Sequence, residues 1–306
     1  MITTVTLSPC IDKTAELSRL ERSKMNRAEN IRLDPGGKGI KVSLALAALK
    51  SSTVALLLNF DGGDIILNAL NSQEIEHDEV RCPGHIRTNL KIYERDTKQT
   101  IEINEQNPTV PQKAAAKLTE LCRQYARKSE ILVLSGSVPP GVPKDIYCTL
   151  AEAAHAENPT LKIVLDAEGE PFIEGLKASP YLVKPNIEEM ERSFGVVLRN
   201  EDDVIELSRK IISEFGVEVV LVSMGADGAI AVTKDEVVHA GALDILPKSA
   251  QGAGDAMVAG ACYAIRKGLP VRDILRCGTC AAAGAVEREG TAFCTRERFE
   301  ELYTRL

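Results

Sequence analysis

Four short apolar runs indicate the architecture of this chain: Glu130-Ile-Leu-Val-Leu134, Leu161-Lys-Ile-Val-Leu165, Tyr181-Leu-Val183 and Val217-Glu-Val-Val-Leu-Val222. Each run is nearly continuous and rich in β-branched residues, which is typical of strands buried on both faces. Helical periodicity fills other segments, namely Pro111 to Arg127, Pro143 to Glu157, Glu201 to Glu214, Gly252 to Lys267 and Val271 to Glu289. This alternation predicts an α/β fold with a mostly parallel central sheet between two layers of helices.

The N-terminal part adds to this pattern and then departs from it. A helix is expected from about Gly39 to Lys50, followed by a strand at 53–58. Residues 13–34 and 86–105 instead show strand-like alternation, with a hairpin pattern at 88–104. We expect these two segments to form a small β-sheet lid over the site, or alternatively an edge extension of the main sheet. No linker divides residues 1–306, so a single domain is predicted.

Composition excludes several classes of protein. The 306 residues carry 37 Lys+Arg and 44 Asp+Glu, for a net charge of −7, and 44% are hydrophobic. These values are typical of a globular chain rather than a disordered one. Without a basic cluster, a nucleic-acid partner is not expected. No apolar run approaches bilayer length, and the first residues do not resemble a signal peptide, so no membrane partner and a cytoplasmic location are expected.

The cysteines predict free thiols rather than a disulfide framework. They are scattered along the chain, at Cys10, Cys82, Cys122, Cys148, Cys262, Cys277, Cys280 and Cys294. Cys277 and Cys280 form one CxxC pair, but no second pair and no suitably spaced His accompany it. The pair lies in an Ala-rich helical stretch, where Cys packs as a small apolar residue. A protein-held zinc ion is therefore not expected.

The sharpest local signal is Gly252-Ala-Gly-Asp255 at the start of an expected helix. Gly252, Ala253 and Gly254 have little side chain, so their N–H groups can approach an anion closely, and the helix dipole adds positive potential. Asp255 in the first turn is expected to keep a low pKa and to act as a weak base, which suits phosphoryl transfer. Alternatively, the glycines only pack tightly and Asp255 only caps the helix.

A second glycine cluster, Pro35-Gly-Gly-Lys-Gly39, also precedes an expected helix. The N–H groups of Gly36 and Gly37 could meet sugar hydroxyls, while Lys38 offers a point charge. As a bare pattern this cluster is equally typical of a turn.

Taken together and in this order, the motifs resemble the ribokinase-like PfkB carbohydrate kinase family. They are most similar to its branch of 1-phosphofructokinases and tagatose-6-phosphate kinases. The resemblance runs from Thr6 to about Thr295 and rests on Thr6-Leu-Ser-Pro-Cys-Ile-Asp-Lys-Thr14, the Gly-Gly-Lys-Gly cluster, Arg87-Thr-Asn-Leu-Lys91, Leu134-Ser-Gly-Ser-Val-Pro-Pro-Gly141, Leu182-Val-Lys-Pro-Asn-Ile-Glu-Glu189, Val222-Ser-Met-Gly-Ala-Asp-Gly228 and Gly252-Ala-Gly-Asp255. It implies a ribokinase-like three-layer α/β/α fold with a β-sheet lid.

The resemblance also implies an activity and an acceptor site. The activity is ATP-dependent phosphorylation of a ketohexose phosphate, with fructose 1-phosphate favoured over tagatose 6-phosphate as acceptor. The sugar would be held by Asp12, Gly36 and Gly37. The phosphate already on the substrate would be surrounded by Arg27, Lys38, Arg87 and Ser137. For Arg87 the alternative is a solvated surface charge, and for Ser137 a turn residue before two prolines.

On the nucleotide side, the resemblance implies ATP and Mg²⁺ as cofactors. The nucleotide would contact Lys184, Asn186, Ser223, Gly225 and Gly228. Mg²⁺ would be organised through water by Asn186 and Glu189, which agrees with its tendency to keep waters. The alternative for Asn186 and Glu189 is an ordinary helix start, with an Asn cap followed by acidic residues.

One departure from the family pattern concerns the acceptor. Position 41 is usually Asn in this family, and here it is Lys41. A long cation in place of a short amide could favour a different acid or phosphate position on the acceptor. A nucleoside or an unphosphorylated sugar as acceptor, or a non-catalytic sugar-phosphate sensor, remain alternatives. A lid with one apolar face could also pair two copies of the chain into a homodimer.

Overall fold

A nine-stranded sheet forms the centre of the molecule, with the strand order β13-β12-β11-β10-β9-β8-β1-β4-β5. The computed structural model describes residues 1–290 and 292–306. The strands are β1 (Ile2–Thr6), β4 (Thr53–Asp61), β5 (Glu76–His85), β8 (Ile131–Ser135), β9 (Lys162–Asp166), β10 (Leu182–Val183), β11 (Val219–Ser223), β12 (Ala229–Val232) and β13 (Val237–Ala240). The neighbouring pairs β11–β12 and β12–β13 are antiparallel, and the other neighbouring pairs of this sheet are parallel. The predicted mostly parallel sheet is confirmed.

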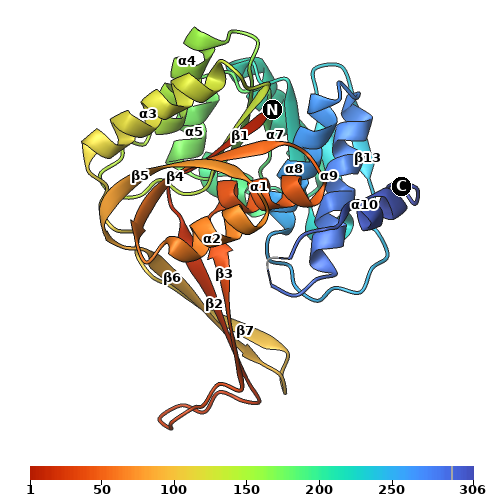
Figure 1. Cartoon of the computed structure of the whole chain (residues 1–306). Coiled ribbons are helices and arrows are strands. Elements are labelled where there is room, and N and C mark those ends of the chain that lie inside the picture. Colours follow the sequence, from red (N-terminus) through yellow and green to blue (C-terminus); the bar gives the residue numbers. More distant parts are fainter. Residues whose placement is uncertain (291) are drawn as a thin grey trace.

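Helices cover both faces of this sheet, which confirms the predicted three layers (Figure 1). One face is covered by α1 (Lys38–Ala48), α8 (Ala253–Arg266) and α9 (Val271–Val286), with α10 (Arg296–Tyr303) packed on α9. The core of the other face includes α2 (Asp64–Ser72), α3 (Gln112–Ala126), α4 (Ile146–Glu157), α5 (Glu170–Leu176), α6 (Ile187–Phe194) and α7 (Glu201–Phe215). No described helix has the length and apolar character needed to cross a membrane.

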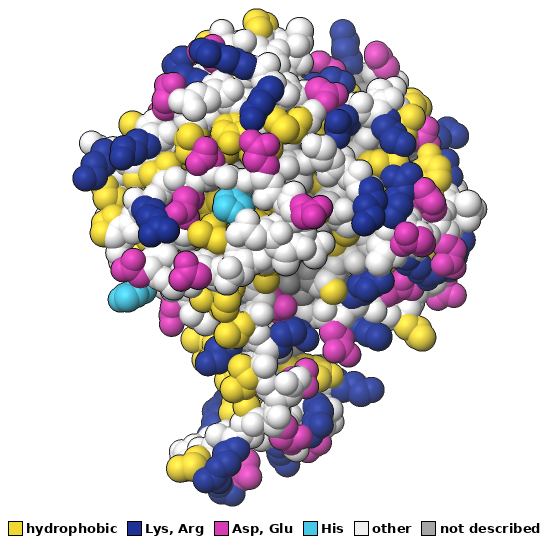
Figure 2. All heavy atoms as spheres, in the orientation of Figure 1, with side chains coloured by type: hydrophobic (Ala, Val, Ile, Leu, Met, Phe, Trp, Pro, Cys, Tyr) yellow, Lys and Arg dark blue, Asp and Glu magenta, His cyan; other side chains and the backbone are white. Residues whose placement is uncertain are grey.

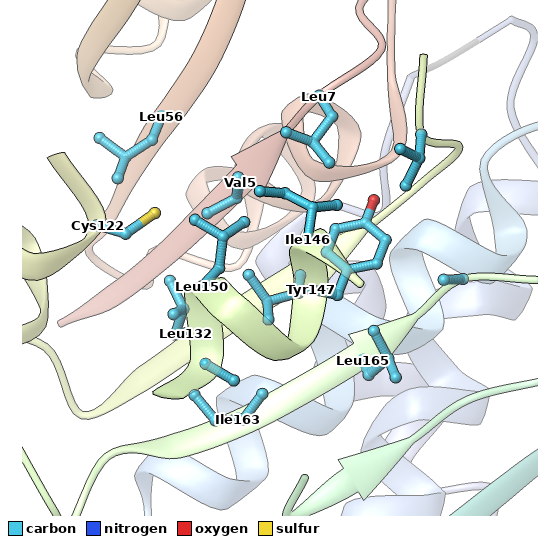
Figure 3. Packing of buried hydrophobic residues seen from close by; sticks show 14 of the residues in the cluster. Val5, Leu7, Leu56, Cys122, Leu132, Ile146, Tyr147, Leu150, Ile163 and Leu165 are labelled. Carbon is cyan, nitrogen blue, oxygen red and sulfur yellow. The ribbon is translucent and has the colours of Figure 1, made fainter. Parts of the chain in front are cut away.

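The packing of α4 against the sheet also holds the loop that follows β8 in place. In Figure 3, Tyr147 and Leu150 of α4 lie against strand residues such as Leu132 and Leu165. Tyr147 is fully buried, and its hydroxyl donates a hydrogen bond of 2.9 Å to the carbonyl oxygen of Gly136. A buried phenol hydroxyl needs such a partner, so the tyrosine holds the loop that follows β8.

The predicted lid is a separate four-stranded sheet with the order β3-β2-β6-β7. Its strands are β2 (Cys10–Leu17), β3 (Asn30–Gly36), β6 (Arg87–Glu94) and β7 (Gln99–Asn104). In Figure 1 it projects from the body, with the loop of residues 18–29 at its far end. The expected hairpin is the pair β6–β7, and the alternative of an edge extension of the main sheet is wrong.

All eight cysteines carry free thiols. Cys277 and Cys280 are buried in α9, where they pack as small apolar side chains, as the helical context of the CxxC pair predicts.

Candidate active site

The site lies where the carboxyl ends of the parallel strands meet. Ser8 and Asp12 follow β1, Asp166 ends β9, Lys184 follows β10 and Ser223 ends β11. In an open parallel sheet this edge is the usual place for a ligand, because the loops after neighbouring strands converge there. The first turn of α8 completes the site from the side of the covering helices, since Lys184 Nζ would lie 3.5 Å from a Cβ placed on Gly254.

The start of α8 is built to receive an anion. Gly252 is the N-cap in the left-handed region, with φ of 74°, and no side chain caps the helix. Among residues 1–290 and 292–306, the N–H groups of Gly254 and Asp255 donate to no acceptor. Free N–H groups at the positive end of a helix dipole form an anion-binding site. The predicted anion hole at Gly252–Gly254 therefore lies at a helix start whose N–H groups are free to bind an anion.

Asp255 is buried beside this anion hole, with 8% of its surface exposed. Its carboxylate makes no hydrogen bond to another described residue. Burial raises its pKa to about 6, although Lys41 acts to lower the value, while Asp166 raises it further. The low pKa expected from the sequence is therefore wrong, because the loss of solvation outweighs the nearby cations. A carboxylate with this pKa is a stronger base than expected and is still ionised at neutral pH.

The lid presents a hydrogen-bonded network to the other side of Asp255. Lys41 Nζ donates to Asp12 Oδ2 at 2.6 Å, and Asn89 Nδ2 donates to Asp12 Oδ1 at 3.0 Å. Arg87 Nη1 donates to Asn89 Oδ1 at 2.8 Å, while Arg87 Nε is buried without an acceptor among the described residues. Burial acts to raise the pKa of Asp12, but Lys41 outweighs it and holds the pKa below the usual value. Asp12 therefore carries a charged carboxylate, which can accept hydrogen bonds from hydroxyl groups.

The two glycines before α1 allow this network to approach the helix. A Cβ on Gly36 would lie 2.4 Å from Cys10 Sγ and 3.3 Å from Asp12 Cγ. Gly37 has φ of 111°, and a Cβ there would lie 2.8 Å from Thr6 Cγ2. Only glycine meets both requirements, which are a close approach and a positive φ. The structure thus places Gly36 against Asp12 and Gly37 against the residues that follow β1, while the sugar-binding role implied by the resemblance stays a prediction.

A second network lies between Asp255 and the nucleotide side. Lys38 Nζ donates to Asp166 Oδ1 at 3.1 Å and to Glu189 Oε1 at 3.4 Å, and Lys184 Nζ lies 3.5 Å from Asp166 Oδ1. Burial opposes the charge of Lys38, but Asp166 and Glu189 more than offset it, so the pKa of Lys38 is raised. Lys38 thus contacts Asp166 and Glu189, and its expected place among the groups around the acceptor phosphate stays a prediction.

Asp166 is a residue of this network that the sequence reasoning missed. It is almost fully buried, and its Oδ2 has no partner among the described residues. Lys184 and Lys38 together hold its pKa below the usual value despite its burial. The available signal was its position, since it is an acidic residue that directly follows three apolar residues of a strand. That signal says nothing about which lysines Asp166 holds, because they come from distant segments.

Two residues predicted to surround the acceptor phosphate, Arg27 and Ser137, form no hydrogen bond or ion pair with Asp12 or Asp255 among the described residues. Arg27 is exposed in the loop of residues 18–29, at the far end of the lid (Figure 1). Within one chain it lies apart from Asp12. Ser137 follows β8 at the edge of the sheet, next to Gly136, and its side chain is exposed. A Cβ on Gly136 would lie 3.7 Å from Lys38 Cβ, so this loop borders the start of α1.

A cavity of about 970 Å³ opens beside the anion hole. Its lining brings together most of the residues predicted for the nucleotide, namely Asn186, Ser223, Gly225 and Gly228, with Ala253 and Gly254. Met224 packs against the core and also lines this cavity. Apolar side chains such as Leu243 and Ile245 line it further, and they suit the flat apolar faces of a nucleobase.

Asn186 and Glu189 form the capping box of α6. Asn186 Oδ1 accepts from the N–H of Glu189 at 2.7 Å, and the Asn186 N–H donates to Glu189 Oε2 at 2.9 Å. These two side chains therefore cap the helix, as the alternative of an ordinary helix start predicts. The two roles are compatible, because oxygens engaged in the cap can still bind the waters of a magnesium ion, and Asn186 lines the cavity.

Comparison with known proteins agrees with this geometry. Residues 5–298 match the pfkB family of carbohydrate kinases. A 1-phosphofructokinase of Xanthomonas campestris is 35% identical over 86% of this chain and 83% of its own. A D-tagatose-1-phosphate kinase of Bacillus licheniformis is 32% identical over 85% and 84%. The crystal structure of phosphofructokinase-2 from Escherichia coli in complex with potassium superposes with a TM-score of 0.93 and 25% identity, over 99% of this chain and 98% of that one.

The family match covers the lid, the anion hole and the cavity described above. The catalytic class follows from the family, and the residues that line the site carry the chemistry that this class needs. The chain belongs to the pfkB family of carbohydrate kinases and is a sugar phosphotransferase.

Proposed function

We propose that this chain transfers the terminal phosphoryl group of ATP to fructose 1-phosphate and forms fructose 1,6-bisphosphate. One observation carries the proposal: a buried carboxylate, Asp255, stands between a large cavity that ends at free helix N–H groups and a cationic polar face on the lid. The relatives named 1-phosphofructokinase support this acceptor. Tagatose phosphates are the second candidate, favoured by the similarity to a D-tagatose-1-phosphate kinase.

In the proposed reaction, Asp255 accepts the proton of the attacking hydroxyl. The hydroxyl oxygen forms a bond to the terminal phosphorus of ATP, the bond from that phosphorus to the bridging oxygen breaks, and ADP leaves. Because the transition state is loose, the base mainly orients the hydroxyl and takes its proton late. With a pKa of about 6, Asp255 is ionised at neutral pH and can take that proton.

Fixed positive groups of the chain stabilise the charge on the phosphoryl group in transit. The N–H groups at the start of α8 point to it, and Lys184 lies beside Gly254. Asp166 holds both Lys184 and Lys38 in place. Groups that are already oriented need no rearrangement when the charge moves, which is why such sites accelerate transfer.

The nucleotide would occupy the cavity of about 970 Å³, with its phosphates toward Gly254. Magnesium would be held through water by Asn186 and Glu189, whose oxygens suit a hard cation. When bound, magnesium neutralises charge on the nucleotide oxygens. Lid residues cover the acceptor, which limits the access of water as a competing acceptor.

A panel assay tests the proposal. ADP release is measured with fructose 1-phosphate, tagatose 1-phosphate, tagatose 6-phosphate, fructose 6-phosphate, ribose and a nucleoside. We expect the highest kcat/KM with fructose 1-phosphate. Turnover confined to ribose or the nucleoside would reject the proposal. If the chain is instead a sensor, no acceptor gives turnover and D255N leaves every property unchanged, whereas a kinase loses turnover with D255N but still binds the sugar phosphate.

We further propose that the apolar face of the lid pairs two copies of the chain. Strand register places Leu33, Lys13, Leu90 and Ile103 in one row and Ile31, Ala15, Ile92 and Ile101 in the next, all on one face. Ile31 is 56% exposed and Ile103 is 54% exposed. Figure 2 shows hydrophobic side chains on the projecting lid. A second copy offers the same face and would bury it. In such a pair Arg27, remote from Asp12 in its own chain, could serve the acceptor phosphate of the partner.

A further inference from the structure

Lys41 is a cation at the centre of the acceptor side that the mechanism above does not use. It lies in the first turns of α1, is 9% exposed, and donates a hydrogen bond of 2.6 Å to Asp12 Oδ2. The ammonium group also lies within electrostatic reach of Asp255, and the two acids together stabilise its charge against burial. A buried lysine with its charge retained between two carboxylates is costly to build unless the charge is needed.

We propose that Lys41 is a specificity-determining residue, whose ammonium group makes the acceptor pocket selective for an anionic acceptor, a sugar phosphate. The inference rests on the proposed function, because that function identifies Asp12 and Asp255 as the groups that meet the acceptor. A lysine ammonium has three N–H donors, and Asp12 takes one of them. The others remain for oxygens of the acceptor, and phosphate oxygens accept them best because they are charged.

The charge balance on the acceptor side supports this role. Lys38 and Lys184 are held by Asp166 on the nucleotide side, and Lys38 also by Glu189. Within one chain, the cations that act on the acceptor side, next to Cys10, are Arg87, Lys41 and Lys91. Lys91 lies 3.7 Å from Glu102, which offsets part of its charge.

Without Lys41, two buried acids would face the incoming acceptor, with Lys91 left to offset the charge of Asp12 and with Lys38 and Lys184, which Asp166 holds, left to offset that of Asp255. Asp12 and Asp255 are each at least nine-tenths buried, so their charges are poorly screened by solvent. A dianionic phosphate would then be repelled, while a neutral sugar would not. A charge in this position therefore discriminates between acceptors rather than strengthening the binding of both.

Arg87 gives an independent indication that an anion belongs here. Its Nη1 is engaged by Asn89, but its Nε is buried without an acceptor among the described residues. Strand register places Arg87 opposite Cys10 and Asn89 opposite Asp12, so these side chains share the lid face that meets Lys41. A buried guanidinium donor without a partner is costly, and an acceptor phosphate would satisfy it.

The test compares two acceptors that differ by one phosphate group. KM and kcat are measured at pH 8 for fructose 1-phosphate and for fructose, with the wild type and with K41M, K41N and K41R. At this pH Asp255 is ionised, so its titration does not enter the comparison. The matched control is K50M, which removes the same charge from an exposed lysine just beyond the other end of α1. Calorimetry measures binding of fructose 1-phosphate without ATP, and thermal unfolding confirms that each variant is folded.

We expect K41M and K41N to raise both KM and the dissociation constant for fructose 1-phosphate by about tenfold or more. The same variants should change kcat/KM for fructose by less than about threefold. K41R should retain most of the selectivity, and K50M should match the wild type. An equal loss for both acceptors, or no loss for either, would overturn the inference. If the wild type turns over neither acceptor, the proposed function fails, and the calorimetric comparison of wild type with K41M still decides the role of Lys41.

Discussion

Asp255 destabilises the folded chain at the pH where it is needed for catalysis. Burial raises its pKa from 3.8 to about 6, so keeping it ionised at pH 8 costs about 3 kcal/mol. D255N removes that charge with little change in shape. We therefore expect D255N to unfold at a temperature several degrees above that of the wild type at pH 8.

The sign of this effect fixes its dependence on pH. The pKa of Asp255 is higher in the folded state than in the unfolded state, so the penalty is present above about pH 6 and disappears as the pH falls toward 3.8. Thermal unfolding of wild type and D255N at pH 8 and pH 4.5 measures it. A mutant that is no more stable than the wild type at pH 8 would show that Lys41 and the other neighbouring lysines need the carboxylate as much as burial opposes it.

The same pKa predicts the acidic limit of the reaction. Asp255 must be ionised to take a proton, so kcat/KM should fall about tenfold per pH unit below about pH 6 and level off above it. The substrate phosphate has its own second ionisation near pH 6. Repeating the profile with unphosphorylated fructose separates the two, because the limb due to Asp255 remains. If the fall of kcat/KM below about pH 6 is absent with fructose, ionisation of the substrate phosphate causes it instead.

Individual site residues were predictable only where a local pattern identifies them. The glycines before Asp255 predict an anion hole from sequence alone. The family resemblance predicts that Asp12 and Arg87 belong to the site. The pairing of Lys41 with Asp12 and of Lys38 with Asp166 could not be predicted, because the partners are brought together by different elements. The pKa of Asp255 depends on its burial by the whole site, which no local pattern shows.

At the scale of elements, the cap of α6 has a stabilising and a functional part that two substitutions can separate. N186A removes the side-chain acceptor for the Glu189 N–H and one residue of the cavity wall. We expect it to cost about 1 kcal/mol of stability and to raise KM for ATP several-fold. Asn200 caps α7 in the same way, accepting from the N–H of Asp203 at 2.9 Å, but it does not line the cavity.

N200A is therefore the matched control for N186A. It should cost a similar amount of stability in urea unfolding and leave KM for ATP unchanged. If both variants changed KM equally, general loosening of the fold would explain the effect. If neither variant changed KM for ATP, Asn186 would act only as a helix cap, a role that its hydrogen bonds already show.

The elements themselves were largely readable from sequence. Continuous apolar runs gave the central strands, and 3.6-residue periodicity gave the helices with ends within a few residues of those observed. The arrangement of β2, β3, β6 and β7 into one lid sheet was less accessible, because β2 pairs with β6 across more than 70 residues of chain. Tight packing of α8 on α9 was also hidden, since it depends on Gly260, where a Cβ would lie 2.3 Å from the Cys277 carbonyl oxygen.

At the scale of the whole molecule, the lid has two faces with different tasks. Its polar face carries Asp12, Asn89 and Arg87 toward the site, while the opposite face carries exposed Ile and Leu side chains. Because side chains alternate along a strand, the residues that bind the acceptor and the residues that would bind a second copy are direct neighbours in sequence. Pairing of the lids should therefore also stiffen the acceptor site, and catalysis should depend on the oligomeric state.

This dependence predicts that specific activity falls when the protein is diluted below the concentration at which two copies pair. I103D places a charge on the apolar face, on its edge strand β7, and should give a monomer in sedimentation, with reduced kcat/KM at every protein concentration. V197D is the control, because Val197 is 73% exposed on the body and outside the lid. R27A should lower activity toward fructose 1-phosphate only where copies are paired, since Arg27 lies far from Asp12 in its own chain. Full activity of a monomeric I103D would mean that each chain closes its own site, and that the apolar face of the lid has no part in the reaction.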